Sequence, residues 1–167
     1  MAGQNSTTAG ASPLFLRDAE IRRGGELLFF GYSRMTRAID EQLVEQGLGR
    51  AHHRALYFIS RHPHLTVGNL LRMLLVTKQS LGRVLGDLTE RGYIETRQGQ
   101  DDRRQKLLRL SDAGTVLEAR LFESMKERIG AAYAHAGQHA VTGFWQVLEG
   151  LIPPEDRDLI GDLNRRG

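Results

Sequence analysis

The segment Arg97–Gly114, RQGQDDRRQKLLRLSDAG, concentrates side chains that can bind a polyanion. Its hairpin part, up to Leu110, has five cations and two carboxylates: Arg97, Arg103, Arg104, Lys106 and Arg109 against Asp101 and Asp102. Guanidinium and ammonium groups form charge-assisted hydrogen bonds to phosphate oxygens. Further along, the alternation places Leu108 and Leu110 on one face of a strand and Arg109 on the other. The pattern therefore predicts a hairpin with a cationic tip and an apolar root.

The elements before this hairpin must position it. Residues 66–76 and 77–92 have helical periodicity, with Thr66 and Thr77 as expected N-caps and Gly92 as the end of the second helix. Residues 93–97 and 106–111 are predicted to form the two strands. Two helices joined by a tight turn and followed by a hairpin with a cationic tip form a winged helix-turn-helix. The hairpin would be its wing.

The helix that begins after Thr77 has two different faces. Four apolar side chains share the inner face: Leu81, Val84, Leu85 and Leu88. The first turn and the outer face carry hydrogen-bonding side chains: Thr77, Lys78, Gln79, Ser80 and Arg83. Such groups at a helix N-terminus can reach base edges and phosphates in DNA. A solvated helix face with two tolerated glycines, Gly82 and Gly86, is the alternative interpretation.

The charged tip of the hairpin shifts the balance toward DNA binding. Arg103, Arg104 and Lys106 lie beside the predicted recognition helix, where an arginine can enter the narrow minor groove. Asp102, two residues before Arg104, can hold that guanidinium in place. We therefore expect the tip of the wing to contact DNA while its root packs into the core.

Helices are expected on both sides of this lobe. Residues 26–47 form an amphipathic pattern, with Gly24–Gly25 as a weak start or kink and Gly47 and Gly49 at its end. A helix over residues 51–62 stops before Pro63. Ser111 is expected to cap a long helix that ends near Gly137, and residues 141–152 form a last amphipathic helix. The predicted fold class is mainly α with a small two-stranded wing.

The stretch LTVGNLLRMLLVTKQSLGRVLGDLTERGYIETRQGQDDRRQKLLRLSDAG closely resembles the MarR family of transcriptional regulators. The wing signature D-x-R…L-[ST]-x-x-G of that family is present as Asp102, Arg104, Leu110, Ser111 and Gly114. The resemblance spans most of the chain, from residue 14 to residue 163. It implies a bacterial homodimer with intertwined N- and C-terminal helices and two winged lobes on a palindromic operator in double-stranded DNA. By position, Arg104 resembles the minor-groove arginine, Asp102 its orienting partner, and residues 77–83 the major-groove reader.

The resulting organisation has four parts. Residues 1–13 are expected to be a disordered tail and residues 14–47 the N-terminal dimerisation helix. Residues 48–113 would be the winged DNA-binding lobe and residues 114–167 the C-terminal dimerisation helices. The expected function is a sequence-specific DNA-binding regulator, acting as a repressor.

A small-molecule effector is expected by resemblance to the family. Phe30, Arg34, His53 and Tyr57 combine aromatic and cationic groups near the expected junction of lobe and dimer helices. Core packing explains His53 and Tyr57 equally well. Because the chain has no cysteine, thiol oxidation is chemically excluded as a signal. The effector would therefore bind non-covalently and would be aromatic or amphipathic.

The six histidines raise a metal hypothesis. His135 and His139 stand at i, i+4 on a helix, and the others lie between His52 and His64. No third carboxylate stands at a matching step and thiolates are absent, so no metal site is expected. A zinc-responsive regulator of the same fold remains the alternative, followed by a winged-helix module that only binds proteins.

Composition excludes several other classes. The chain of 167 residues has a net charge of +3 and a pI near 9.6, which is compatible with a polyanion partner. No apolar run is long enough to span a bilayer, and residues 1–12 do not form a secretory signal. Phosphate loops, nucleophile elbows and metalloprotease motifs are absent. We therefore expect a cytoplasmic protein that is not an enzyme and needs no cofactor.

Overall fold

The computed structural model describes residues 13–99 and 105–157. Two compact units divide the chain, the first ending at Arg37 and the second beginning at Ala38. In the first unit, a short 3-10 helix, η1 (Pro13–Leu16), precedes α1 (Asp18–Glu45), whose last turns belong to the second unit.

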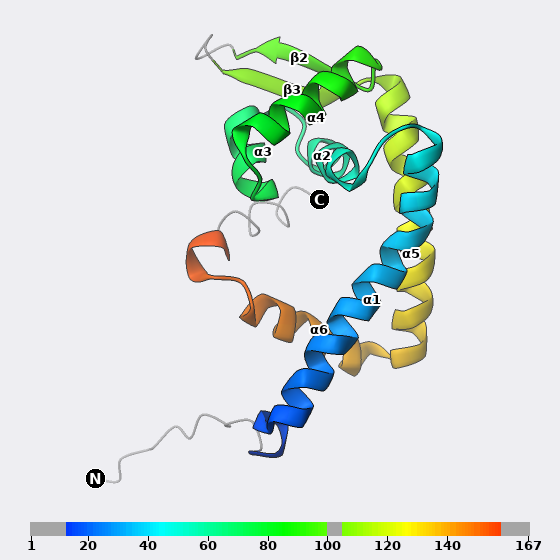
Figure 1. Cartoon of the computed structure of the whole chain (residues 1–167), viewed down its shortest axis with the longest axis vertical. Helices are drawn as coiled ribbons and strands as arrows, with labels where there is room; N and C mark the ends of the chain where they lie inside the picture. Colours follow the sequence, from blue (N-terminus) through cyan, green and yellow to red (C-terminus); the bar gives the residue numbers. More distant parts are fainter. Residues whose placement is uncertain (1–12, 100–104, 158–167) are drawn as a thin grey trace, which may run out of the picture. The chain divides into compact units, whose positions relative to one another are not determined.

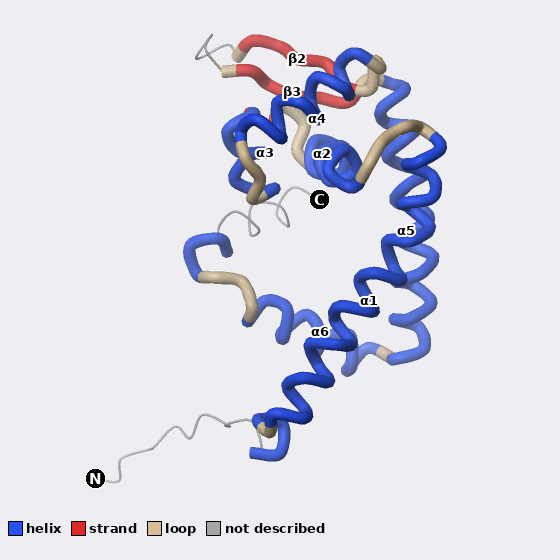
Figure 2. The backbone as a smooth tube through the Cα atoms, in the orientation of Figure 1, coloured by secondary structure: helices blue, strands red, loops and turns tan. Residues whose placement is uncertain are grey.

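The described part of the second unit contains the helices α2 to α6, three strands and a last helical turn at residues 154–157. In chain order the labelled elements are α2 (Arg50–Arg61), β1 (Leu65–Thr66), α3 (Val67–Leu74), α4 (Lys78–Glu90), β2 (Ile94–Gln98), β3 (Lys106–Leu110), α5 (Asp112–Ala136) and α6 (Gln138–Gly150). This order of helix, helix, hairpin and helix confirms the predicted winged helix-turn-helix. α2 packs against α3, α4, α5 and β3, and α4 lies beside β2 (Figures 1 and 2).

The sheet has three antiparallel strands, not two, in the order β1-β3-β2. β2 and β3 form the predicted wing, with Ile94 opposite Leu110 and Gln98 opposite Lys106. β1 adds a pairing of Leu65 with Leu108 on the other edge of β3. β1 is not predictable from the sequence pattern, because two residues are too short for a visible alternation.

Apolar side chains from every helix of the lobe form one core. The side chains with at most 1% exposure are Ile39, Leu43, Ala55, Leu56, Ile59, Leu70, Leu81, Leu88, Leu108 and Leu121. Leu108 is buried and Leu110 half-buried, whereas Arg109 points the other way toward Glu95, as the alternation predicts. The core therefore holds the root of the wing and the inner face of α4.

The helix ends follow local capping chemistry. Thr66, Thr77 and Ser111 each accept a hydrogen bond from the backbone N–H three residues later, which confirms the three predicted N-caps. α1 begins at Asp18, upstream of the predicted start, so Gly24–Gly25 does not begin the helix. Asp18 and Glu20 in its first turn favour the positive end of the helix dipole and support this earlier start.

Candidate nucleic-acid interface

The first turn of α4 presents a cluster of exposed polar side chains. Thr77 Oγ1 accepts a hydrogen bond from the Ser80 backbone N–H at 3.2 Å and donates one to Ser80 Oγ at 2.9 Å. This pair caps the helix and leaves Lys78 and Gln79 exposed at its N-terminus. Arg83 is exposed one turn further along. The structure thus brings all five predicted α4 residues to one accessible helix end.

The inner face of α4 explains why these residues point outward. Leu81, Val84 and Leu88 are at most 8% exposed and pack into the core. Burial of these side chains fixes which side of the helix faces solvent. Gly82 and Gly86 lie on the outer side, and a Cβ added at either would have no neighbour within 4 Å. The outer surface of α4 is therefore accessible down to its backbone.

The wing lies next to this helix. β2 and β3 run in register as far as Gln98 and Lys106, and the Gly99 N–H donates to the Gln105 carbonyl at 2.9 Å. Lys106 is exposed at the end of β3 nearest the turn. Three predicted DNA-contacting residues, Asp102, Arg103 and Arg104, lie outside the described residues. Their roles remain predictions.

One of the five cations counted in the sequence is neutralised within the wing. Arg109 donates from Nε to Glu95 Oε2 at 2.7 Å, and its Nη2 lies 2.6 Å from the same oxygen. Glu95 and Arg109 are directly opposite each other on β2 and β3. Such a cross-strand pair stabilises the hairpin. Arg109 therefore contributes to the register of the wing rather than to a free positive charge.

The residues of the predicted effector site belong to both units. Phe30 and Arg34 are on the first-unit part of α1, while His53 and Tyr57 are on α2. The rings of His53 and Tyr57 have centroids 6.4 Å apart. Burial lowers the pKa of the His53 imidazole, although the Asp40 carboxylate opposes this shift. His53 Nε2 is buried and has no hydrogen-bond partner within the described part of the chain.

Two carboxyl groups of the second unit have shifted pKa values. The hydrogen bond from Arg50 holds the pKa of Asp40 below its usual value. Burial raises the pKa of Glu118, although the Ser60 hydroxyl and Arg61 favour its ionised form. Neither group lies on α4 or the wing.

Two further features bear on the other functional classes. In residues 13–99 and 105–157, no three His, Asp or Glu side chains are grouped closely enough to hold a metal ion. The zinc alternative therefore gains no support from these residues. None of the described helices has the length and apolar character needed to cross a membrane.

The geometry defines the class of fold, a winged helix-turn-helix. The model of the MarR family matches residues 46–105, which lie between the end of α1 and the start of β3. The chain is 47% identical over 148 residues to the HTH-type transcriptional regulator PetP of Rhodobacter capsulatus, an alignment that covers 89% of each chain. The chain belongs to the MarR family and is a transcription regulator, not an enzyme.

Solved structures share the fold at lower identity. A MarR-family regulator from Silicibacter pomeroyi has a TM-score of 0.66 and 21% identity, covering 77% of this chain and 86% of its own. A mutant MarR from E. coli complexed with operator DNA has a TM-score of 0.64 and 22% identity, covering 85% of this chain and 100% of its own.

Two interactions that connect α4 to neighbouring elements could not be predicted from the sequence. Asp87 contacts His52, and Arg91 contacts the carbonyl groups of Gln46 and Gly47. These partners are far apart in the chain, so no local pattern signals them.

Proposed function

We propose that the protein is a cytoplasmic homodimeric repressor that binds a palindromic operator through α4 and the wing. The observation that carries the proposal is the exposed, capped first turn of α4 beside the β2–β3 hairpin. Gln79 and Arg83 would read base edges in the major groove. Arg104 would enter the minor groove, oriented by Asp102. The E. coli relative complexed with operator DNA supports this assignment.

Exposed apolar side chains support the dimer. On α1, Leu27, Phe29 and Phe30 are each about 60% or more exposed. On α6, Trp145 is 50% and Val147 65% exposed, and no described residue of that helix is buried. Large apolar side chains exposed on a helix mark a surface suited to a protein interface, and a twofold dimer is the commonest assembly that covers such a surface.

A non-covalent effector would release the operator. The buried Nε2 of His53 lacks a partner within the described residues, and burial favours the neutral imidazole. A neutral imidazole beside the Tyr57 ring can bind an aromatic or amphipathic molecule with one hydrogen-bonding group. The participation of Phe30 and Arg34 stays a prediction.

Selection of bound sequences from random duplexes tests the central proposal. A dimeric reader should yield an inverted repeat with half-site centres about one helical turn apart. Placing the selected sequence between a promoter and a reporter should lower transcription when the protein is present. Failure to enrich any sequence at moderate salt would contradict sequence-specific binding.

Substitutions separate the two DNA-reading elements. Arg83→Ala should weaken operator binding by about 1–3 kcal/mol and relax preference at one position per half-site. Arg104→Ala should weaken binding to operator and unrelated duplex alike and reduce the salt slope by about one. Asp102→Ala should resemble a milder Arg104→Ala although it removes a negative charge. Tighter operator binding by Asp102→Ala would contradict the orienting role.

A further inference from the structure

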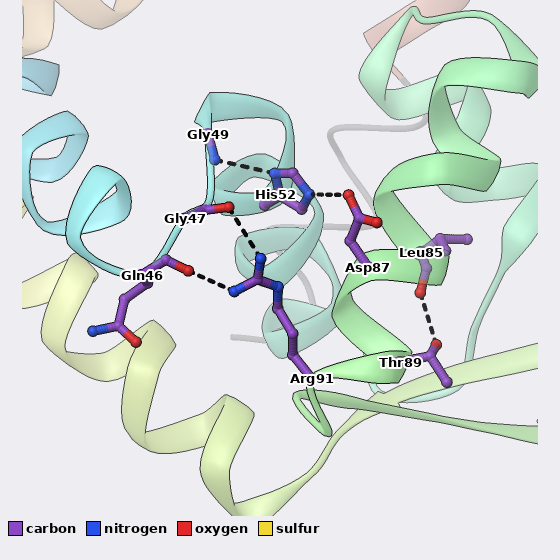
Figure 3. A network of polar contacts seen from close by, with 8 residues as sticks. All are labelled: Gln46, Gly47, Gly49, His52, Leu85, Asp87, Thr89 and Arg91. Atoms are coloured by element: carbon purple, nitrogen blue, oxygen red, sulfur yellow. Dashed lines mark hydrogen bonds and ion pairs between the residues drawn. The ribbon is translucent and has the colours of Figure 1, made fainter.

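α4 has a second polar side, which faces the connection between α1 and α2. Asp87 Oδ2 lies 3.1 Å from His52 Nε2, and one turn later the Arg91 guanidinium reaches two backbone carbonyls (Figure 3). Arg91 donates from Nη1 to the Gln46 carbonyl at 2.6 Å and from Nη2 to the Gly47 carbonyl at 3.3 Å. We call these contacts the α4 anchor.

The position of the hydrogen on His52 follows from its other contact. His52 Nδ1 accepts the Gly49 backbone N–H at 3.1 Å, so Nδ1 carries no hydrogen in this arrangement. In the neutral imidazole, Nε2 therefore bears the hydrogen and donates it to Asp87. The His52 side chain is only 15% exposed, whereas Asp87 is 53% exposed. One imidazole thus joins the N-terminus of α2 to the exposed side of α4.

The backbone that Arg91 contacts is itself well defined. The Leu48 N–H donates to the Leu43 carbonyl at 2.8 Å, and the Gly47 N–H donates to the Val44 carbonyl at 2.9 Å. With Gly47 at a φ of +63°, these bonds form a Schellman motif at the end of α1. Leu48 is buried in the core directly after it. The carbonyls bound by Arg91 are therefore held in fixed directions.

The anchor supplies directionality that the core lacks. Leu81, Val84 and Leu88 bury the inner face of α4, but apolar contacts are non-directional and tolerate a small rotation about the helix axis. Hydrogen bonds at Asp87 and Arg91 lose strength when their angles change. Since Arg83 lies one turn before Asp87, a rotation of α4 would move its guanidinium relative to a bound base pair.

The anchor also keeps Asp87 away from Arg83. The two residues stand at i, i+4, the spacing at which opposite charges pair on a helix surface. Within the part of the chain that is described, Arg83 has no ion pair, and the contact that Asp87 makes is with His52. An Asp87 released from His52 could pair with Arg83 and compete with DNA for it.

We propose that His52, Asp87 and Arg91 are positioning residues, which set the rotation of α4 and keep Arg83 available without contacting DNA. This inference rests on the proposed function, because it concerns how α4 reads an operator. It predicts that operator preference and protein stability can be changed separately at position 52.

Two isosteric substitutions of His52 make that separation. His52→Asn places a side-chain oxygen near the Nδ1 position, so it retains the bond to Gly49 but cannot reach Asp87. His52→Gln places an amide N–H near the Nε2 position, so it retains the bond to Asp87 but not the bond to Gly49. His52→Asn should unfold at the wild-type temperature yet bind the selected operator about three- to tenfold more weakly, with little change on unrelated duplex.

His52→Gln should restore operator affinity even though it unfolds at a lower temperature. The proposed role of the α4 anchor is contradicted if operator affinity instead follows the unfolding temperature across the two variants. The proposed role is also contradicted if both variants bind the operator as tightly as the wild type. A wild-type protein that prefers no duplex would contradict the proposed function, which is a different result from either of these.

A double-mutant cycle tests the pair directly. Asp87→Ala should weaken operator binding, although removal of a negative charge alone predicts tighter binding. Glu90→Ala is the matched control, because Glu90 is exposed on the same helix and has no hydrogen bond or ion pair within the described residues. This control should bind the operator as tightly as the wild type or more tightly. The double variant His52→Asn, Asp87→Ala should bind the operator no more weakly than the weaker-binding single variant. If its loss of operator affinity equals the product of the two single losses, His52 and Asp87 act independently and the proposal is wrong.

Discussion

The backbone around Gly114 leaves no room for a side chain. A Cβ at this position would lie 1.9 Å from the Tyr93 carbonyl oxygen. That carbonyl accepts the Ser111 N–H at 3.0 Å, and Ser111 Oγ accepts the Gly114 N–H at 3.0 Å. The serine and glycine of the wing signature therefore join the start of α5 to the residue before β2.

Gly114→Ala should consequently destabilise the protein by about 3 kcal/mol, because the added methyl group must displace backbone. The measurement is urea unfolding followed by circular dichroism. Gly86→Ala is the control, since its Cβ would meet nothing within 4 Å. This control should be neutral or stabilise by up to about 1 kcal/mol. Equal stability of Gly114→Ala and the wild type would show that the helix start can shift freely.

The half-buried carboxyl of Glu118 predicts a pH dependence of stability. Burial raises its pKa in the folded state above 4.5, so the folded protein binds more protons and loses stability as the pH rises through that window. Glu118→Gln cannot ionise and retains an acceptor for the Ser60 hydroxyl. The variant should therefore gain free energy of unfolding relative to wild type at about pH 7 and lose this advantage near about pH 4.

Urea unfolding of both proteins at the two pH values measures this difference. Glu123→Gln is the control, because Glu123 is exposed and pairs with Lys126 on the same helix. It should change stability by no more than about 0.5 kcal/mol at either pH. A Glu118→Gln protein with a gain that is independent of pH would contradict the assigned ionisation.

Sequence reasoning succeeds for residues whose role is local. Thr66, Thr77 and Ser111 were predicted as N-caps because the bond joins a side chain to a backbone N–H three residues away. His52 and Asp87 are separated by 35 positions, and their contact depends on how α2 and α4 pack. Residue types alone carry no information about that packing.

At the scale of elements, the sequence predicts segments with a clear periodicity well, but it does not predict a strand that depends on tertiary pairing or a helix start that precedes two glycines. α4 and the β2–β3 pair lie within two residues of the predicted bounds. β1 was missed because its two residues depend on pairing with β3. The first turns of α1 are not predicted because Gly24 and Gly25 have low helix propensity and suggest that the helix begins after them. In the structure, the two glycines lie inside a long helix, which they weaken without ending it.

Gly82 and Gly86 are expected to lower the stability of α4 while allowing DNA to approach its backbone. Both lie on its outer side, where neither Cβ would meet another atom. Gly82→Ala should stabilise the protein by about 0.5–1 kcal/mol through helix propensity. The same methyl group should weaken operator binding if DNA approaches the α4 backbone closely. Chemical denaturation and operator titration on one preparation measure both effects.

Lys126→Ala provides a baseline for Gly82→Ala, because Lys126 is exposed on α5 and its ion pair with Glu123 is worth little. This control should leave operator affinity unchanged. A more stable Gly82→Ala protein that binds its operator like the wild type would show that the glycines do not serve DNA approach.

At the scale of the whole molecule, exposed apolar side chains on α1 and α6 are the surfaces that a second chain would cover. α1 exposes Ile21, Leu27 and Phe29, each at 57% or more. In α6, Trp145 Nε1 donates to the Tyr133 hydroxyl at 3.0 Å, which fixes the indole against α5 while half of it remains exposed. An indole held in place at the surface is suited to an interface with a second chain.

A charge placed on the exposed surface of α6 should prevent dimerisation without unfolding the winged lobe. Phe144 is 44% exposed on α6 next to Trp145, so Phe144→Glu should leave the winged lobe folded but bury an unpaired carboxylate in the proposed dimer. Sedimentation at micromolar concentration should shift from dimer to the 18.7 kDa chain. With one lobe bound instead of two, the slope of log affinity against log salt should fall to about half.

Gln146→Glu is the matched control for Phe144→Glu, because it adds the same charge to α6 at an exposed position that is already polar. It should remain dimeric and retain the full salt slope. If Phe144→Glu also remains dimeric, α6 does not form the interface, and the exposed face of α1 is the next surface to substitute. If it becomes monomeric while the salt slope stays unchanged, each wild-type dimer binds DNA through one lobe, and the palindromic operator is contradicted.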